Sequence, residues 1–106
     1  MKILVTGAGG FVARYLIPYL LKQGQEVIAT DLSSDCIQDC EWASKVRFKP
    51  CDIHQPPKRI YAFFQVPDMV IHLAWGGLPN YQDPVHIEVN YPGSYHFLKA
   101  LITQGV

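Results

Sequence analysis

One stretch constrains the fold more than any other, the glycine-rich segment VTGAGGFVARYL that runs from Val5 to Leu16. It follows a short apolar run and precedes apolar residues at helical spacing, so it predicts a strand, a tight turn and a helix. Such a turn brings backbone N–H groups to a helix N-terminus, where the unpaired donors and the helix dipole favour a phosphate. The spacing is GxxGxxA, from Gly7 through Gly10 to Ala13. Alanine is tolerable at the third position because that residue packs the helix against the strand.

The rest of the chain alternates between strand-like and helix-like segments. Apolar runs predict strands at Lys2–Thr6, Glu26–Thr30, 46–49 and 69–74, and helical patterns cover 11–23, 35–43, 56–65 and 84–104, with a loop at 75–82. This alternation indicates an α/β fold, a Rossmann-type doubly wound parallel sheet truncated after about four strands in the order 3-2-1-4. The length fits one domain, residues 1–106. Pro18 lies inside the first helix, so we expect a kink or a late break there.

An acidic residue lies where a dinucleotide site needs one. Asp31 follows the second predicted strand, close to the ~20-residue offset from the first glycine at which a carboxylate accepts hydrogen bonds from the adenosine ribose. The same carboxylate repels a 2′-phosphate, and no lysine or arginine follows it before Lys45. We therefore expect the cofactor to be NAD, with NADP disfavoured.

Charge and cysteine content exclude several classes of function. Nine basic residues balance nine acidic ones, so no overall field attracts nucleic acid or an anionic membrane. No apolar run approaches the ~20 residues of a membrane span or resembles a signal peptide, and we expect a cytoplasmic location. Cys36, Cys40 and Cys51 form no CxxC pair. They predict neither a disulfide framework nor a metal site, but ordinary, partly buried thiols.

Four motifs in order carry a resemblance to a known family. TGAGGFVA is followed by Asp31, by CDI at 51–53, by VIHLA at 70–74 and by NYPGSYHFLKA at 90–100. With this arrangement the chain resembles the N-terminal portion of extended short-chain dehydrogenases/reductases, and among them the NAD-dependent epimerase/dehydratase family that acts on nucleotide sugars. The resemblance covers nearly the whole chain. It implies a parent enzyme that moves a hydride from a sugar carbon to NAD and back, in epimerisation, dehydration or reduction.

The resemblance also assigns cofactor contacts, residue by residue. It implies that the pyrophosphate is lined by Gly7, Gly10 and the backbone at Phe11 and Val12. Asp31 would hold the ribose, and Asp52 and Ile53 would contact the adenine. The middle of the cofactor would lie along Leu73, Ala74 and Trp75, with Asn90 near the site. Two positions depart from the family, which usually has glycine at Ala13 and a small residue at Trp75. An indole at position 75 would crowd the cofactor or the sugar.

No catalytic residue is expected within this chain. Tyr95 and Lys99 have the Tyr-x-x-x-Lys spacing of an acid/base pair, but in the family this segment precedes the catalytic strand, and the genuine pair lies further along. We therefore expect the catalytic and substrate-binding parts beyond Val106, and the chain alone to be inactive. We interpret His72 as a core histidine with both nitrogens satisfied, and His86, Glu88 and His96 as a solvated helix face.

The predicted order of the strands also suggests how the chain associates with other chains. The predicted strand at 69–74 would be the last of the sheet, and its free apolar edge favours a homodimer or aggregation. Two alternatives to the enzyme remain open. One is a non-catalytic NAD(P)-sensing binding module, and the other is an atypical NADP or flavin reductase, which would bind NADP more tightly than NAD.

Overall fold

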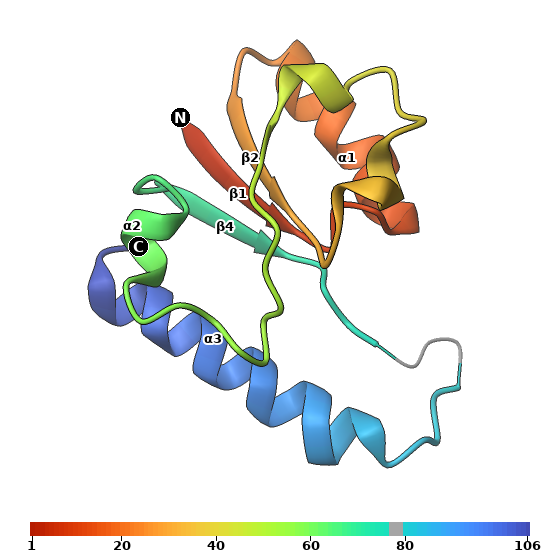
Figure 1. Cartoon of the computed structure of the whole chain (residues 1–106), viewed down its shortest axis with the longest axis vertical. Helices are drawn as coiled ribbons and strands as arrows, with labels where there is room; N and C mark the ends of the chain where they lie inside the picture. Colours follow the sequence, from red (N-terminus) through yellow and green to blue (C-terminus); the bar gives the residue numbers. More distant parts are fainter. Residues whose placement is uncertain (77–79) are drawn as a thin grey trace.

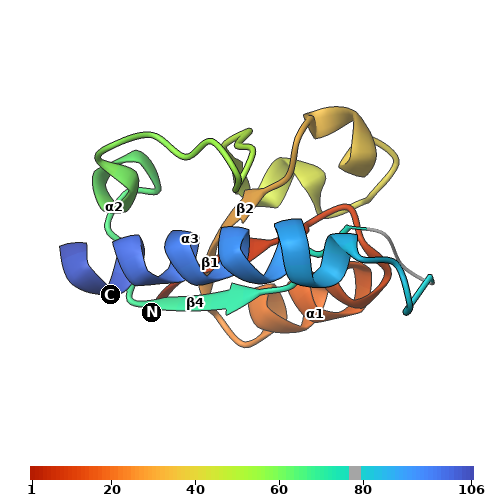
Figure 2. The same ribbon diagram turned by 90° about the horizontal axis from the view of Figure 1, so that it is seen from below.

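The computed structural model describes residues 1–76 and 80–106, which form a four-stranded parallel sheet with helices on both faces (Figures 1 and 2). The strands are β1 (Lys2–Thr6), β2 (Glu26–Thr30), β3 (Arg47–Phe48) and β4 (Met69–His72), in the order β3-β2-β1-β4. This is the predicted order, so the doubly wound α/β fold is confirmed. In the centre of the sheet Ile3 of β1 is in register with Val27 of β2 and with Met69 of β4.

Alternation along the strands divides the core between the two faces of the sheet. On one face Ile3 and Val5 pack beneath α1 (Phe11–Lys22), which buries Ala13, Ile17 and Leu20. On the other face Leu4 and Ile28 meet α2 (Ile60–Phe63) and α3 (Tyr91–Gln104), through the buried side chains Ile60, Phe64, Phe97 and Leu101. None of the described helices is both long and apolar enough to cross a membrane.

The first helix continues past its proline. Residue Pro18 lies inside α1, which extends to Lys22 without the late break expected there. Ile17 and Leu20, on either side of the proline, are both buried against the sheet. Their packing offsets the loss of one helical hydrogen bond.

The segment after β2 differs from the predicted helix at 35–43. It contains two 3₁₀ turns, η1 (Ser34–Ile37) and η2 (Ala43–Lys45). Ile37 and Trp42 are both buried in the core beside α1. Their five-residue spacing places them on different faces of an α-helix, so burying both requires an interruption.

The helix predicted at 56–65 is shortened at both ends, to α2. The turn containing Pro56 and Pro57 stays outside α2, and the helix is followed by Gln65 and Val66, whose φ angles are 63° and 60°. Non-glycine residues rarely adopt this left-handed conformation. Distant residues hold it in place: Lys2 Nζ donates to the Gln65 carbonyl at 2.8 Å, and the Arg47 guanidinium donates to Gln65 Oε1 at 2.6 Å.

The bounds of the last strand and of the long helix also differ from those predicted. β4 ends at His72 instead of residue 74, because the Thr6 hydroxyl oxygen accepts the N–H groups of Leu73 and Ala74 at 2.9 and 3.1 Å. The helix predicted at 84–104 consists of a π-helical turn, η3 (His86–Asn90), followed by α3. The predicted loop at 75–82 includes residues 77–79, which lie outside the described residues.

Candidate functional site

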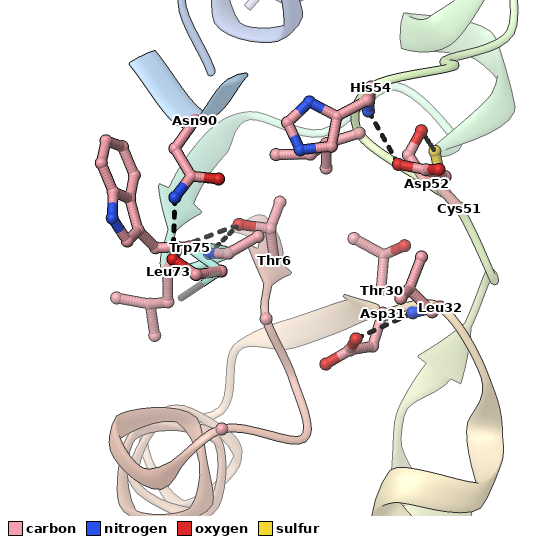
Figure 3. Close-up of a pocket in the computed structure, with 15 residues that line it drawn as sticks. Thr6, Thr30, Asp31, Leu32, Cys51, Asp52, His54, Leu73, Trp75 and Asn90 are labelled. Atoms are coloured by element: carbon pink, nitrogen blue, oxygen red, sulfur yellow. Dashed lines mark hydrogen bonds between the residues drawn. The ribbon is translucent and has the colours of Figure 1, made fainter. Parts of the chain in front are cut away.

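A cavity of about 400 Å³ opens at the carboxyl ends of the strands (Figure 3). This edge of a doubly wound sheet is where such folds bind their ligands. The lining residues come from the ends of β1 and β2, the segments that follow β2, β3 and β4, the turn after β1, and η3. They are Thr6, Gly7, Gly10, Thr30, Asp31, Leu32, Cys51, Asp52, Ile53, His54, Leu73, Ala74, Trp75, Gly76 and Asn90.

The turn between β1 and α1 has no room for a side chain at Gly7 or Gly9. Gly7 has a φ of 68°, and a Cβ there would lie 2.8 Å from the carbonyl carbon of Leu73. A Cβ at Gly9 would lie 2.5 Å from the Cβ of Cys36. Gly10 is the N-cap of α1, makes no side-chain capping bond and is followed by no acidic residue in the first turn. The N-terminal N–H groups of α1 therefore keep their partial positive charge for a ligand anion.

Asp31 ties the end of β2 to the glycine turn. Its Oδ2 accepts the N–H of Gly9 at 2.9 Å, and its Oδ1 accepts the N–H of Leu32 at 2.8 Å. Burial, and then the nearby Asp31 carboxylate, raise the pKa of the Cys36 thiol, so this thiol stays protonated at neutral pH. The Arg14 guanidinium donates to the Cys36 carbonyl at 3.2 Å and pairs with Asp39 at 3.6 Å, and Arg14 is not among the residues that line the cavity.

The segment after β3 forms the opposite wall of the cavity. Asp52 Oδ1 accepts the N–H of His54 at 2.9 Å, which leaves Oδ2 able to accept from a ligand. The His54 ring lies against Gly93 of α3, where an added Cβ would overlap it. Burial, and then Asp52, raise the pKa of the Cys51 thiol. This wall therefore offers a carboxylate oxygen beside a protonated thiol.

A part-buried hydrogen-bond network joins Thr6, which lines the cavity, to His72 and Ser94. His72 Nδ1 is 2.8 Å from the Thr6 hydroxyl, and His72 Nε2 is 2.9 Å from the hydroxyl of Ser94 in α3. Because the Thr6 oxygen already accepts two N–H groups, its proton goes to Nδ1, and Nε2–H donates to Ser94. Burial lowers the pKa of His72, consistent with a neutral ring. Both ring nitrogens of His72 are paired, as expected, but the residue is only half-buried and lies outside the two core clusters.

The β4 end of the cavity is held by η3. The Trp75 indole N–H donates to His86 Nδ1 at 2.7 Å, and the Asn90 amide donates to the Gly76 carbonyl at 2.7 Å. His86 is half-buried and hydrogen-bonded to Trp75, eleven residues earlier, so the expectation of a solvated helix face holds for it only in part. Glu88 and His96 are exposed as expected.

Nine of the residues predicted from sequence line this one cavity: Gly7, Gly10, Asp31, Asp52, Ile53, Leu73, Ala74, Trp75 and Asn90. Phe11 and Val12 are not among the lining residues and are 77% and 56% exposed; the contact expected of them is through their backbone N–H groups. Sequence reasoning missed Thr6, Thr30, Leu32, Cys51, His54 and Gly76. Thr6 and Thr30 end adjacent parallel strands, a position that could have identified them, whereas nothing in the local pattern singled out His54.

The Tyr95–Lys99 pair lies outside the cavity. Both side chains are exposed on α3, where the Lys99 ammonium sits 5.7 Å from the centre of the Tyr95 ring. Cys36, Cys40 and Cys51 are free thiols, and within residues 1–76 and 80–106 no three His, Cys, Asp or Glu side chains are grouped as metal ligands.

Comparison with known proteins gives consistent matches. The sequence profile of the NAD dependent epimerase/dehydratase family matches residues 3–106. The chain is 27% identical to dTDP-6-deoxy-L-talose 4-dehydrogenase (NAD(+)) of Aggregatibacter actinomycetemcomitans, over 100% of this chain and 38% of that protein. The chain thus spans well under half the length of this curated relative.

Solved structures share the fold. UDP-glucose-4-epimerase from Stenotrophomonas maltophila, with bound NAD and formylated UDP-arabinopyranose, superposes with a TM-score of 0.74 and 25% identity over 100% of this chain and 34% of that one. UDP-glucose 4-epimerase from Thermotoga maritima, with UDP-glucose, gives a TM-score of 0.66 and 28% identity over 100% of this chain and 35% of that one.

Proposed function

The chain belongs to the NAD-dependent epimerase/dehydratase family, and on this basis we propose that its cavity binds NAD. In the proposed arrangement the pyrophosphate lies at Gly7 and Gly10, where it accepts N–H groups of Phe11 and Val12 at the N-terminus of α1. The adenine lies by Asp52 and Ile53. Leu73, Ala74 and Trp75, with Asn90 nearby, take the remainder of the cofactor.

The observation that carries this proposal is the position of Asp31. Its carboxylate lies beside the glycine turn, 2.9 Å from the Gly9 nitrogen, and lines the same cavity as Gly7 and Gly10. A carboxylate in this place can accept hydrogen bonds from ribose hydroxyls next to a pyrophosphate. The glycines also agree with a phosphate-binding turn, because side chains at positions 7 and 9 would collide with neighbouring residues of the turn's surroundings.

Asp31 also supports NAD over NADP. A 2′-phosphate on the adenosine ribose would meet the Asp31 carboxylate, and Asp52 adds a second negative charge to the same cavity. Among the described residues that line the cavity there is no lysine or arginine, and Arg14 is bound to Asp39 and the Cys36 carbonyl. The phosphate charge would therefore remain uncompensated.

The whole enzyme is proposed to act on a nucleotide sugar. Bound NAD would accept a hydride from a sugar carbon and return it, as in epimerisation, dehydration or reduction. Relatives of known structure that act on UDP-sugars support this substrate class. The exposed Tyr95–Lys99 pair takes no part, so we propose that this chain by itself binds the cofactor without catalysing the reaction.

Self-association is proposed through β4. This strand is the last in the sheet order, so among the described residues its outer edge has no strand partner. An apolar groove of about 330 Å³ lies beside that edge, lined mainly by Met69, Val70, Leu98, Leu101, Ile102 and Val106. Unpaired backbone groups next to apolar side chains favour pairing with a second copy of the chain.

Calorimetric titration of the chain with NAD⁺ and NADP⁺ tests the cofactor proposal. We expect NAD⁺ to bind more tightly than NADP⁺, and Asp31→Ala to weaken NAD⁺ while improving NADP⁺. The matched control is Asp35→Ala, which removes the same charge from an exposed position outside the cavity and should leave both affinities unchanged. Equal affinity for the two cofactors, or no effect of Asp31→Ala, would refute the assignment.

A further inference from the structure

The Trp75 and His86 rings form one flat surface. The indole N–H donates to His86 Nδ1 at 2.7 Å, and the ring planes differ by only 10° with centroids 5.8 Å apart. The donor hydrogen and the acceptor lone pair both lie in their ring planes. Rings joined by this bond in nearly parallel planes therefore lie edge to edge, so His86 covers an edge of the indole and leaves its faces uncovered.

The position of His86 is itself fixed by hydrogen bonds. Nδ1 faces two donors, the Trp75 indole and the Asn90 amide at 3.3 Å, while Nε2 faces the Asn80 carbonyl at 2.6 Å. Nδ1 must therefore be an acceptor, and Nε2 must carry the proton. In this tautomer both imidazole nitrogens are hydrogen-bonded, and Nδ1 fixes the indole ring through the indole N–H.

The indole stands at one end of the cavity. Trp75 lines the cavity on the β4 side, away from Asp31 and Asp52 (Figure 3). Its side chain is 40% exposed, and no ring other than His86 is paired with it among the described residues. A cofactor whose adenosine lies at Asp31 and whose pyrophosphate lies at the glycine turn would extend its other ring toward this indole.

We propose that the Trp75 indole is a stacking surface for the nicotinamide ring, with His86 as the positioning residue that orients it. This inference rests on the proposed NAD site. The nicotinamide ring is positively charged when oxidised and neutral when reduced, and the face of an indole attracts cations more strongly than any other side-chain ring. Trp75 would then bind the oxidised cofactor more tightly than the reduced one.

The ratio of two dissociation constants, for NADH over NAD⁺, measures this preference. We expect Trp75→Ala to lower the ratio about two- to fivefold, the range for a cation on a partly exposed aromatic face. Trp75→Phe, which retains a weaker aromatic face and loses the indole N–H, should give an intermediate ratio. A merely structural role for Trp75 would weaken both redox forms equally.

Two further variants test the positioning role. His86→Ala removes the acceptor and should shift the ratio toward that of Trp75→Ala. His86→Asn keeps an acceptor oxygen near the place of Nδ1 and should restore much of the original ratio. Circular dichroism and melting curves confirm that each variant is folded.

The outcomes separate the two proposals. If the unchanged chain binds NAD⁺ and the ratio stays the same in folded Trp75→Ala and Trp75→Phe, the stacking inference is overturned and the cofactor site stands. If the unchanged chain binds neither redox form, the proposed function fails and the inference fails with it.

Discussion

Replacement of Gly7 by alanine tests the geometry of the glycine turn, and the chain supplies a matched control. Gly7 and Gly24 both have left-handed backbone, with φ of 68° and 80°. A Cβ at Gly7 would lie 2.8 to 2.9 Å from the backbone of Leu73 and Ala74, whereas a Cβ at Gly24 would meet nothing within 4 Å. The backbone cost of about 1–2 kcal/mol is common to both variants, and only Gly7→Ala adds an overpacking cost of about 1–3 kcal/mol.

We therefore expect Gly24→Ala to lower the free energy of unfolding by about 1–2 kcal/mol and Gly7→Ala by about 2–5 kcal/mol. Urea unfolding followed by circular dichroism measures both, and each kcal/mol corresponds to about 4–8 °C in melting temperature for a domain near this size. Gly7→Ala should also abolish NAD⁺ binding in calorimetry, and Gly24→Ala should retain it. Equal destabilisation of the two variants would refute the close approach of Gly7 to the Leu73–Ala74 backbone.

Three other predictions follow from packing, protonation and the free strand edge. Ala13→Gly should cost about 1–2 kcal/mol of stability, from helix propensity and a lost buried methyl, yet leave NAD⁺ affinity within about twofold, since Ala13 is buried away from the cavity; a large loss of affinity would contradict its packing role. Burial lowers the pKa of His72 in the folded chain below its ordinary value of 6.5, so the unfolded chain takes up a proton first and stability falls as the pH drops below that value. Urea unfolding at several pH values should show that the free energy of unfolding falls less for His72→Gln than for the unchanged chain, and equally for the exposed control His96→Gln. If His72→Gln shows the same fall as the unchanged chain, the role of His72 is contradicted. Sedimentation should show dimers or larger species that Ile102→Lys converts to monomers, because Ile102 is 64% exposed in the groove beside β4; a monomeric unchanged chain would contradict the proposal.

Local sequence patterns predicted β1, β2 and the glycine turn, because each carries its signal within a few residues. The apolar β1 and β2 runs, the glycines and Asp31 all belong to one βαβ unit. Parallel strands end at the same edge of a sheet. Gly7, Gly10 and Asp31 were assigned from their own sequence context, whereas the other six predicted residues that line the cavity were assigned through the family resemblance.

The errors fall where distant contacts override local preference. Valine strongly disfavours positive φ, so the left-handed Val66 after α2 could not be predicted from residues nearby; it depends on a turn fixed by Lys2 and Arg47. Likewise the N–H of Leu73 donates to the Thr6 hydroxyl and not to a neighbouring strand, and the Trp75 indole N–H donates to His86 of η3. In each case a side chain far along the sequence supplies a hydrogen bond that periodicity cannot reveal.

Amide chemical shifts during an NAD⁺ titration test the central claim most directly. In ¹⁵N–¹H spectra of the chain, the largest changes should fall on the N–H groups of Gly9, Gly10, Phe11 and Val12, with a further change at Leu32 beside Asp31. The groove residues Leu101 and Ile102 should not respond. An unperturbed glycine turn, or shifts concentrated in the groove, would contradict a cofactor site at the N-terminus of α1.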